Sequence, residues 1–420
     1  MSLKILKIDS KGKRIGLAAF ASVFLIGALF AAKWGFAHTA ARNADMPEVA
    51  DFAISLGPDD PQTHYTAAVL LEKTFVPEDQ ARSLAEYEKA AALSPNNYLL
   101  WLELGRARER IGDQIGAESA LRKALELAPN YSRVQWTLGN VLLRQGKMDE
   151  GFAEIRRAVA VDTAYTNAAA GTAWLLLDGD MAAVRAAIGD STRLNAALAA
   201  LLAEQKRFDE SFEIWSSLPA DEKPTILKDL GNVLQTRMFE AKKYRYSRTI
   251  TGQIGLSDNP ASLISNGGFE IALKMQNPGV FEWQIGTGTN PRIGQTDGQK
   301  YSGTYSLLVS FGNGGREFRT ISQILAVKPG ESYGLAFFYR SDVKTGAVFK
   351  WEIANAVDGK TLSATAPLSN NTEWVGIRTN FTGPQDSDGV IIRLVRENCE
   401  TSACSVTGNL WFDDFGLELK

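Results

Sequence analysis

The residues of this chain that could carry out catalysis are not grouped as an active site requires. The two histidines, His38 and His64, lie far from any serine or cysteine nucleophile motif, so no Ser-His-Asp or Cys-His arrangement is predicted. Asp413 and Asp414 are adjacent, and neighbours along a strand point to opposite faces, whereas a glycosidase needs two facing carboxylates. Two acids from separate strands stay an open alternative. We predict no catalytic residues and no enzyme activity.

The two cysteines, Cys399 and Cys404, are separated by four residues near the C-terminus. A pair at this spacing forms a small disulfide loop in an oxidising compartment, and two free thiols are the alternative. Zinc is not predicted, because the sequence has no second pair of ligands. We favour the disulfide, since the N-terminal segment predicts export from the cytoplasm.

The composition is that of folded globular domains. Of the 420 residues, 45% are hydrophobic and 22% are charged, which leaves room for about two or three domains with cores of their own. The formal net charge of −3 gives no electrostatic reason to expect a nucleic-acid partner.

An apolar segment near the N-terminus predicts a membrane anchor. Residues 15–32 carry no charge over 18 positions, a helix length of about 27 Å that nearly matches the hydrocarbon core of a bilayer. Basic residues precede it: Lys4, Lys7, Lys11, Lys13 and Arg14. A cleaved signal peptide is the alternative, but its apolar region is shorter and ends at a small-x-small cleavage site.

The basic residues also predict the orientation of this anchor, because such flanks stay in the cytoplasm. We expect residues 1–14 to form a cytoplasmic tail and residues 15–36 a single-pass anchor in the bacterial inner (cytoplasmic) membrane. The domains that follow would then lie in the periplasm.

A spacing of 34 residues repeats through the first half of the chain. Small and apolar residues recur at this step: Leu70, Leu104 and Leu138, and Gly105 and Gly139. The clearest unit, residues 98–131, resembles the tetratricopeptide repeat (TPR), in which small residues let two antiparallel helices pack closely. The resemblance implies an α-solenoid of helix pairs over residues 45–246, with a groove that docks a protein partner.

Within this array, residues 166–246 are expected to form a degenerate cap that ends in one helix from Pro224 to about Tyr246. Docking would fall to polar residues of the first helices that the repeat pattern does not fix. These are Glu103, Arg106, Gln135 and Asn140.

Beyond a polar linker at residues 247–261, the hydrophobic pattern changes to the alternation typical of strands. Strands are expected at residues 304–311, 321–327, 333–340, 348–353, 376–381, 390–395 and 411–419. Many short strands separated by turn residues predict an antiparallel β-sandwich over residues 262–420.

Three segments of this region, residues 266–270 (NGGFE), 301–307 (YSGTYSL) and 410–417 (LWFDDFGL), carry a family resemblance. They are similar to the jelly-roll carbohydrate-binding modules of the CBM4/9/22-like group. The resemblance implies a jelly roll in which most large aromatic residues are packed inside. The residues expected in the core are Trp283, Tyr333, Trp374 and Trp411.

The same resemblance implies two kinds of binding residue. Sugar binding would use side chains on the face opposite the core: Phe338, Arg340, Lys350, Glu352 and Arg393, with Phe349 and Trp351 if the strand is in the other register. A structural calcium ion would lie between the first and last strands, where Glu270 and Asp413 match the acidic positions. Acids that are only solvated or hydrogen-bonded are the alternative.

These patterns together predict a multidomain α + β protein with an N-terminal transmembrane helix, an α-solenoid of TPR helix pairs and a C-terminal jelly roll. We expect an extracytoplasmic accessory protein that docks a protein through its repeats and binds polysaccharide through its sandwich, in exopolysaccharide or envelope assembly. The alternatives are a protein-protein scaffold whose sandwich binds no sugar, and a glycoside-processing enzyme.

Overall fold

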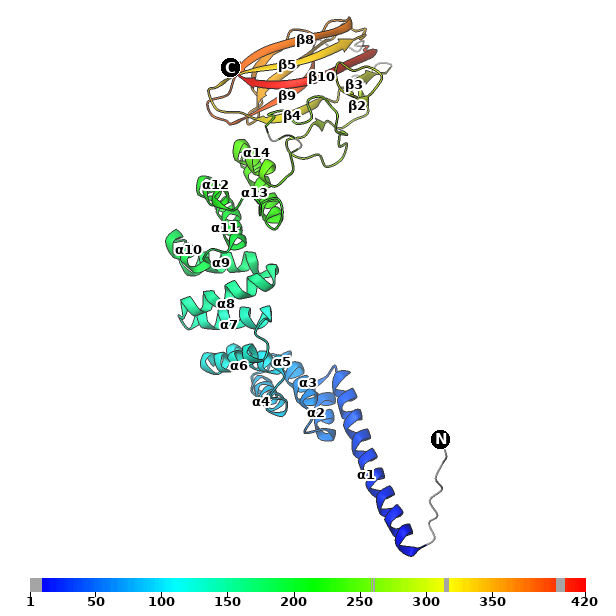
Figure 1. The fold of residues 1–420 in the computed structure, drawn as a ribbon, viewed down its shortest axis with the longest axis vertical. Helices are drawn as coiled ribbons and strands as arrows, with labels where there is room; N and C mark the ends of the chain where they lie inside the picture. The colour runs from blue at the N-terminus through cyan, green and yellow to red at the C-terminus, as the bar shows by residue number, and fades with distance from the viewer. Residues whose placement is uncertain (1–9, 258, 260, 313–316, 398–404) are drawn as a thin grey trace. The chain divides into compact units, whose positions relative to one another are not determined.

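The computed structural model confirms the predicted fold class. It describes residues 10–257, 259, 261–312, 317–397 and 405–420, and within them helices fill the N-terminal half and two antiparallel sheets the C-terminal half (Figure 1). The chain divides into two compact units, Met1–Gly189 and Asp190–Lys420.

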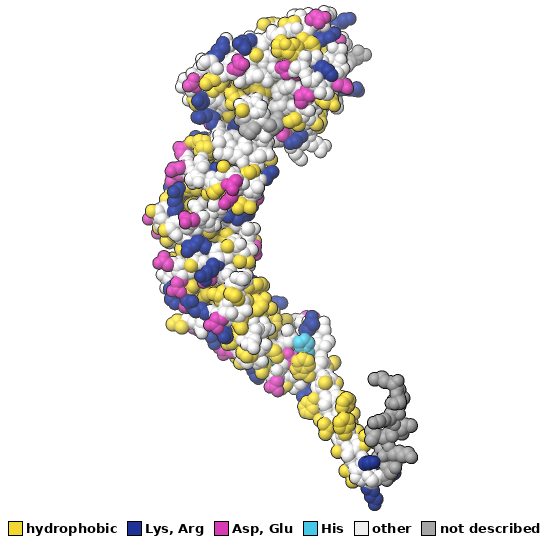
Figure 2. Space-filling view, viewed as in Figure 1, with side chains coloured by type: hydrophobic (Ala, Val, Ile, Leu, Met, Phe, Trp, Pro, Cys, Tyr) yellow, Lys and Arg dark blue, Asp and Glu magenta, His cyan; other side chains and the backbone are white. Residues whose placement is uncertain are grey.

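Helices make up the described part of the first unit. They are α1 (Lys11–Arg42), α2 (Pro47–Leu56), α3 (Pro61–Glu72), α4 (Pro77–Leu93), α5 (Tyr98–Arg110), α6 (Gln114–Leu127), α7 (Ser132–Arg144), α8 (Met148–Val161), α9 (Thr166–Leu176) and α10 (Met181–Ile188), with a 3-10 turn at Thr163–Tyr165. Apolar side chains cover the length of α1 (Figure 2), and by length and composition α1 is able to span a membrane or to act as a signal sequence.

The last turns of α1 pack against α2 and α3. Ala37 and Ala41 are fully buried there, and a Cβ on Gly57 would stand 2.9 Å from the Ala37 methyl group. His38 faces the carboxylate of Asp60 at 2.9 Å, and Asp60 also caps the N-terminus of α3. The apolar helix and the first helices of the array therefore form one packed body.

The helix pairs α5–α6 and α7–α8 pack as the repeat pattern predicts. A Cβ on Gly105 would stand 2.5 Å from the Leu121 side chain, and one on Gly139 would stand 2.8 Å from Ile155. Both glycines therefore let their paired helices touch. Large side chains fill the space between the two pairs: Leu102, Leu121, Val134, Leu138 and Leu142.

A second contact is repeated in these helix pairs. In each, a side chain of the first helix bonds to a backbone carbonyl in the loop before that helix. Trp101 donates from its indole to the carbonyl of the proline six residues earlier, at 2.9 Å, and Gln135 does the same from its amide at 2.8 Å. His64 is fully buried, and its Nε2 lies 2.8 Å from the corresponding proline carbonyl. Because a carbonyl only accepts, Nε2 carries a proton there. The three side chains occupy one repeat position.

This position corrects the predicted register of the first repeat. His64 precedes Trp101 by 37 residues rather than 34, because α4 holds 17 residues where α6 and α8 hold 14. Ala67, which is fully buried, is therefore the counterpart of Leu104, while Leu70 is only partly buried. The prediction that Leu70 takes the repeat position of Leu104 is wrong, because three additional residues in α4 shift every position before them.

The second unit begins with four helices, α11 (Thr192–Glu204), α12 (Phe208–Ser217), α13 (Lys228–Glu240) and α14 (Tyr244–Gln253). The single terminal helix expected from Pro224 to Tyr246 is wrong, because Lys242 adopts φ +60° and this left-handed residue separates α13 from α14. The linker expected at residues 247–261 begins too early, since α14 continues to Gln253.

Two five-stranded antiparallel sheets form the rest of the unit. The strands are β1 (Gln284–Ile285), β2 (Arg292–Thr296), β3 (Ser306–Phe311), β4 (Ile321–Ala326), β5 (Ser332–Ser341), β6 (Val348–Asn355), β7 (Thr361–Ala364), β8 (Asn371–Thr382), β9 (Gly389–Glu397) and β10 (Gly408–Leu419). We call the sheet of order β1-β4-β9-β6-β7 sheet A and the sheet of order β2-β3-β10-β5-β8 sheet B.

The core lies between the two sheets. The alternation predicted for β5 is confirmed, because Tyr333, Leu335, Phe337 and Tyr339 are buried there. All seven predicted strands are present. Strands β1, β2 and β7 were not predicted, since they are 2, 5 and 4 residues long and too short to show an alternating pattern.

The helix α14 is joined to the sandwich at its N-terminus. Asp388, in the loop between β8 and β9, accepts hydrogen bonds from the backbone amides of Tyr244 and Arg245, both at 3.0 Å. The Tyr244 ring packs against Ala326, and it lies so close to Gly389 that no Cβ fits there. The last helix of the array and the sandwich therefore share an interface.

Candidate functional site

The predicted sugar-binding side chains do not form one site. Trp351 is fully buried in the core, where its ring contacts Phe412 and Phe415. Its prediction is wrong, because β6 directs both Phe349 and Trp351 toward the core. The others lie on two outer faces: Lys350, Glu352 and Arg393 on sheet A, and Phe338 and Arg340 on sheet B.

The outer face of sheet A presents an ion pair among aliphatic side chains. Glu352 accepts hydrogen bonds from Arg393 Nε, at 3.1 Å, and from the Thr361 hydroxyl. Burial acts to raise the pKa of Glu352, but these two donors outweigh it and hold the pKa below its ordinary value. At the β4 end of the face, Ile324 packs in a cluster with Tyr244 of α14. Outward positions of the described strands carry no aromatic ring and include Ser322, Ile324, Lys350, Ile391 and Val395.

The outer face of sheet B presents aromatic rings instead. Tyr301 stacks on Phe338 with ring centroids 3.6 Å apart and planes inclined by 12°, and Trp374 meets Tyr301 edge-on at 6.1 Å. The guanidinium of Arg340 lies 5.9 Å from the centroid of Trp411. We call the set Tyr301, Phe338, Trp374 and Trp411 the aromatic platform.

The platform differs from the core in its exposure to solvent. Tyr301 is 45% exposed, and Trp374 and Trp411 are partly exposed. The expectation that all four large aromatics are core residues is confirmed for Trp283 and Tyr333 and wrong for these two tryptophans. The sequence around Trp411 indicates that this side chain points outward. Its apolar neighbours on both sides in β10 are buried on the inner face, so the residue between them lies on the outer face.

The two predicted calcium ligands hold the loop that carries Tyr301. Asp413 Oδ2 accepts hydrogen bonds from the amides of Tyr301 and Ser302, at 2.9 and 3.1 Å. Glu270 Oε1 accepts two more, at 2.9 and 3.0 Å, from amides at the end of the same loop. The two acids therefore fix this loop over sheet B.

The described residues contain no group of three or more His, Cys, Asp or Glu side chains that could hold a metal ion. A calcium ion bound between Glu270 and Asp413 would need most of its ligands from backbone carbonyls. The calcium site stays a prediction.

The two acids differ in their surroundings. Asp413 is fully buried, and desolvation raises its pKa although three backbone amides donate to it. Glu270 is exposed, and the amides of Tyr305 and Thr304 hold its pKa below the ordinary value. Glu270 therefore accepts these amide hydrogen bonds best as a carboxylate.

The four predicted docking residues are engaged within the TPR array. Glu103 pairs with Arg106 at 2.8 Å and with Arg133 at 3.1 Å, and Asn140 donates to a carbonyl one turn earlier in α7 at 2.8 Å. Gln135 is buried and closes the loop before α7. It cannot reach a partner, so its prediction is wrong. The side chain of Arg106 keeps 38% exposure.

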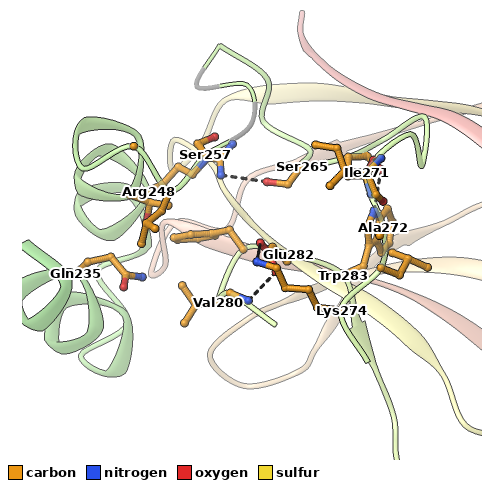
Figure 3. Close-up of a pocket in the computed structure, with 17 residues that line it drawn as sticks. Gln235, Arg248, Ser257, Ser265, Ile271, Ala272, Lys274, Val280, Glu282 and Trp283 are labelled. Carbon is orange, nitrogen blue, oxygen red and sulfur yellow. Dashed lines mark hydrogen bonds and ion pairs between the residues drawn. The ribbon is translucent and has the colours of Figure 1, made fainter. Parts of the chain in front are cut away.

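A cavity of about 420 Å³ lies between α13, α14 and the loops before β1 (Figure 3). Arg248 reaches from α14 to donate to Ser265 at 3.1 Å, and its guanidinium lies 5.6 Å from the ring centroid of Phe281. Lys274 and Glu282 pair in the wall at 2.7 Å. The cavity belongs to the contact between helices and sandwich, not to the outer face of sheet B.

Both histidines are bonded to acidic side chains, His38 in α1 and His64 in α3. His38 is bonded to Asp60 and His64 to Glu86. Cys399 and Cys404 lie outside the described residues, and their disulfide stays a prediction.

Comparison with known proteins identifies one segment in each half of the chain. A family model for the carbohydrate binding domain matches residues 261–401, and one for the tetratricopeptide repeat matches residues 98–131. The chain therefore combines TPR repeats with a carbohydrate-binding module, as the sequence predicted. Neither of these domain types is catalytic.

Individual relatives match parts of the chain. Over 105 residues it is 33% identical to the BBSome complex member bbs-4 of Caenorhabditis elegans, a match that spans 25% of this chain and 22% of that protein. A solved CBM4 structure is 17% identical, with 37% of this chain and 99% of that chain covered and a TM-score of 0.29. The MamA structure from Desulfovibrio magneticus RS-1 is 17% identical, with 42% and 95% covered and a TM-score of 0.32.

Proposed function

We propose that this chain is a non-catalytic accessory protein, anchored in a membrane, that docks a protein through its TPR repeats and binds polysaccharide through its sandwich. The observation that carries the proposal is the presence of TPR repeats and a carbohydrate-binding module in one chain behind a long apolar helix. Export or assembly of an extracellular polysaccharide is the setting in which we expect such a protein to act.

The packing at the end of α1 supports an anchor over a cleaved signal sequence. A signal sequence is removed without consequence for the mature fold, but Ala37, His38 and Ala41 are packed against α2 and α3. Cleavage in this stretch would expose the apolar surfaces of both helices to water. For the orientation we rely on the basic residues before the apolar segment, which favour a cytoplasmic location for residues 1–14. We propose that the repeats and the sandwich then lie in the periplasm of a bacterium.

Two measurements test the anchor and its orientation. Intact-mass spectrometry of the membrane fraction should find the uncleaved chain, and an enzyme that is active only in the periplasm should be active when fused after Lys420. A soluble product that lacks α1 would contradict the anchor. Activity of a reporter that functions only in the cytoplasm would contradict the orientation.

Sugar binding is tested on the full chain, because a fragment that starts at residue 259 would strip α14 from Ala326 and Asp388. The chain is purified in a detergent without a sugar headgroup and applied to a glycan array. Binding to one polysaccharide class would support the proposed function. A folded chain that binds no glycan would contradict it.

A protein-protein scaffold is the second candidate function. One observation favours it, namely that the sandwich already uses part of sheet A to pack on the array, through Ile324 and Tyr244. If the chain is a scaffold, it should bind no glycan on the array. Crosslinking in membranes should then map a protein partner to the surface of the sandwich.

A further inference from the structure

We propose that the polysaccharide binds across the outer face of sheet B, with its pyranose rings on the aromatic platform and its hydroxyl groups bonded to Arg340. This inference rests on the proposed sugar-binding function and names the site that performs it. Sheet A, although it carries Glu352 and Arg393, would not be the sugar-binding face.

The platform is a continuous surface built from three strands and a loop. Trp411 of β10 is paired with Arg340 of β5, and Phe338 lies two residues along β5 on the same face. Opposite Phe338, β8 places Gly376, where a Cβ would stand 3.1 Å from the phenyl ring. The glycine therefore lets this ring extend over the backbone of β8, and Tyr301 stacks on it.

The chemistry of the platform suits a pyranose. One face of a sugar ring is lined by C–H groups that pack on an aromatic ring, while the hydroxyl groups at its edge need hydrogen-bond partners. Arg340 lies against Trp411 and donates to Gln299 at 2.7 Å, so a donor and an acceptor stand beside the rings. Exposed apolar rings with polar neighbours are typical of a binding surface.

The platform is also held in place before a ligand arrives. Tyr301 is the exposed end of the surface, and it sits on a loop whose amides are bonded to Asp413 and Glu270. A loop that is already ordered loses little conformational entropy when it binds. Asp413 and Glu270 therefore act as positioning residues for Tyr301 and need not touch the sugar themselves.

Sheet A offers a weaker surface for a sugar. Its centre is the Glu352–Arg393 pair, whose charges already bond to each other at 3.1 Å. Its outward positions in the described strands lack aromatic rings, and α14 covers its β4 end through Tyr244. A sugar there would find no aromatic ring to stack on and would meet Tyr244 at the β4 end.

The test compares platform variants with matched controls in the full chain. Native affinity electrophoresis is run in gels that contain xylan, β-1,4-galactan or dextran, and with any polysaccharide class that the array identifies. Trp374→Ala and Trp411→Ala should each raise Kd by about tenfold, and the double variant should abolish retardation. Tyr305→Ala removes a 40% exposed ring from the same loop, and Arg393→Ala breaks the sheet A pair. Both controls should bind like wild type.

Each outcome decides between named alternatives. If the platform variants melt and bind like wild type, or if Arg393→Ala alone loses binding, the site is not on sheet B. If the platform variants keep sugar binding but lose a protein partner, the platform is a docking surface for protein. If the wild-type chain binds no polysaccharide on array or gel, the sugar-binding function itself fails, and this site with it.

A second variant guards against misfolding. Should Trp411→Ala unfold, Arg340→Gln replaces the guanidinium beside Trp411 while leaving the rings in place. It should weaken binding and leave the melting temperature unchanged. Unchanged binding by a folded Arg340→Gln variant would remove Arg340 from the site.

Discussion

Asp388, in a loop of the β-sandwich, caps the helix that begins at Tyr244. The Tyr244 amide donates to Asp388 Oδ1 at 3.0 Å, although the two residues are 144 positions apart in the sequence. A helix N-terminus leaves amides without intrahelical partners, and a side chain directly before the helix usually accepts from one of them. Lys243, which precedes α14, makes no such bond. The sandwich therefore completes the last helix of the array.

We predict that Asp388→Ala lowers the free energy of unfolding by about 1 kcal/mol, the usual cost of losing a helix cap. A thermal melt followed by circular dichroism should show a melting temperature lower by a few degrees. Asp388→Asn keeps an acceptor and should lie between Asp388→Ala and wild type. Identical melts for all three chains would show that α14 does not depend on this contact.

The glycines of the array should respond to substitution in opposite directions. Gly139→Ala would place a Cβ 2.9 Å from the Gly151 carbonyl and should destabilise the chain by about 1–3 kcal/mol, despite the better helix propensity of alanine. Gly171→Ala, in α9, meets nothing within 4 Å and should stabilise it by about 0.5–1 kcal/mol. Urea unfolding measures both. A stabilising Gly139→Ala would contradict the close approach of α7 and α8.

Chelation separates two roles for the acids beneath the Tyr301 loop. Because Asp413 and Glu270 accept amide hydrogen bonds from this loop, we expect Glu270→Gln to lower the melting temperature. If the two acids also hold the predicted calcium ion, EDTA should lower the melting temperature of the wild-type chain and added calcium should restore it. A wild-type melting temperature that EDTA leaves unchanged would remove calcium from this position.

The ion pair on sheet A should contribute to stability above acidic pH. The pKa of Glu352 is lower in the folded chain than its ordinary value, so its contribution is present above about pH 4.3 and is lost as pH falls through the folded pKa. Glu352→Gln should therefore flatten the fall in melting temperature between about pH 5 and pH 3. Glu331→Gln, in an exposed turn, serves as the control. Equal slopes for both variants and wild type would contradict this assignment.

Local patterns in the sequence were enough to predict the architecture. The 34-residue step gave the TPR pairs because Gly105 and Gly139 must be small for their helices to touch. The alternation of Tyr333 to Tyr339 gave the sandwich because one side of a strand faces the core. Each signal lies within one repeat unit or one strand, so neither needs a contact between distant parts of the chain.

Contacts between distant residues set the features that the sequence did not reveal. The outer boundary of the array could not be predicted, since the cap of α14 is supplied from beyond β8. The aromatic platform depends on a loop that brings Tyr301 over Phe338, 37 residues later in the chain. Three additional residues in α4 were also missed, because the positions after them keep the 34-residue step.

Helix α1 has a mechanical consequence for any membrane it enters. It is one unbroken helix from Lys11 to Arg42, and its final turns are the ones that pack on α2 and α3. If its apolar part spans a bilayer, no flexible tether separates the lipid from the first helices of the array. The tilt of one helix would then set the height and direction at which these first helices meet neighbouring proteins, whereas a tethered domain would sample every orientation.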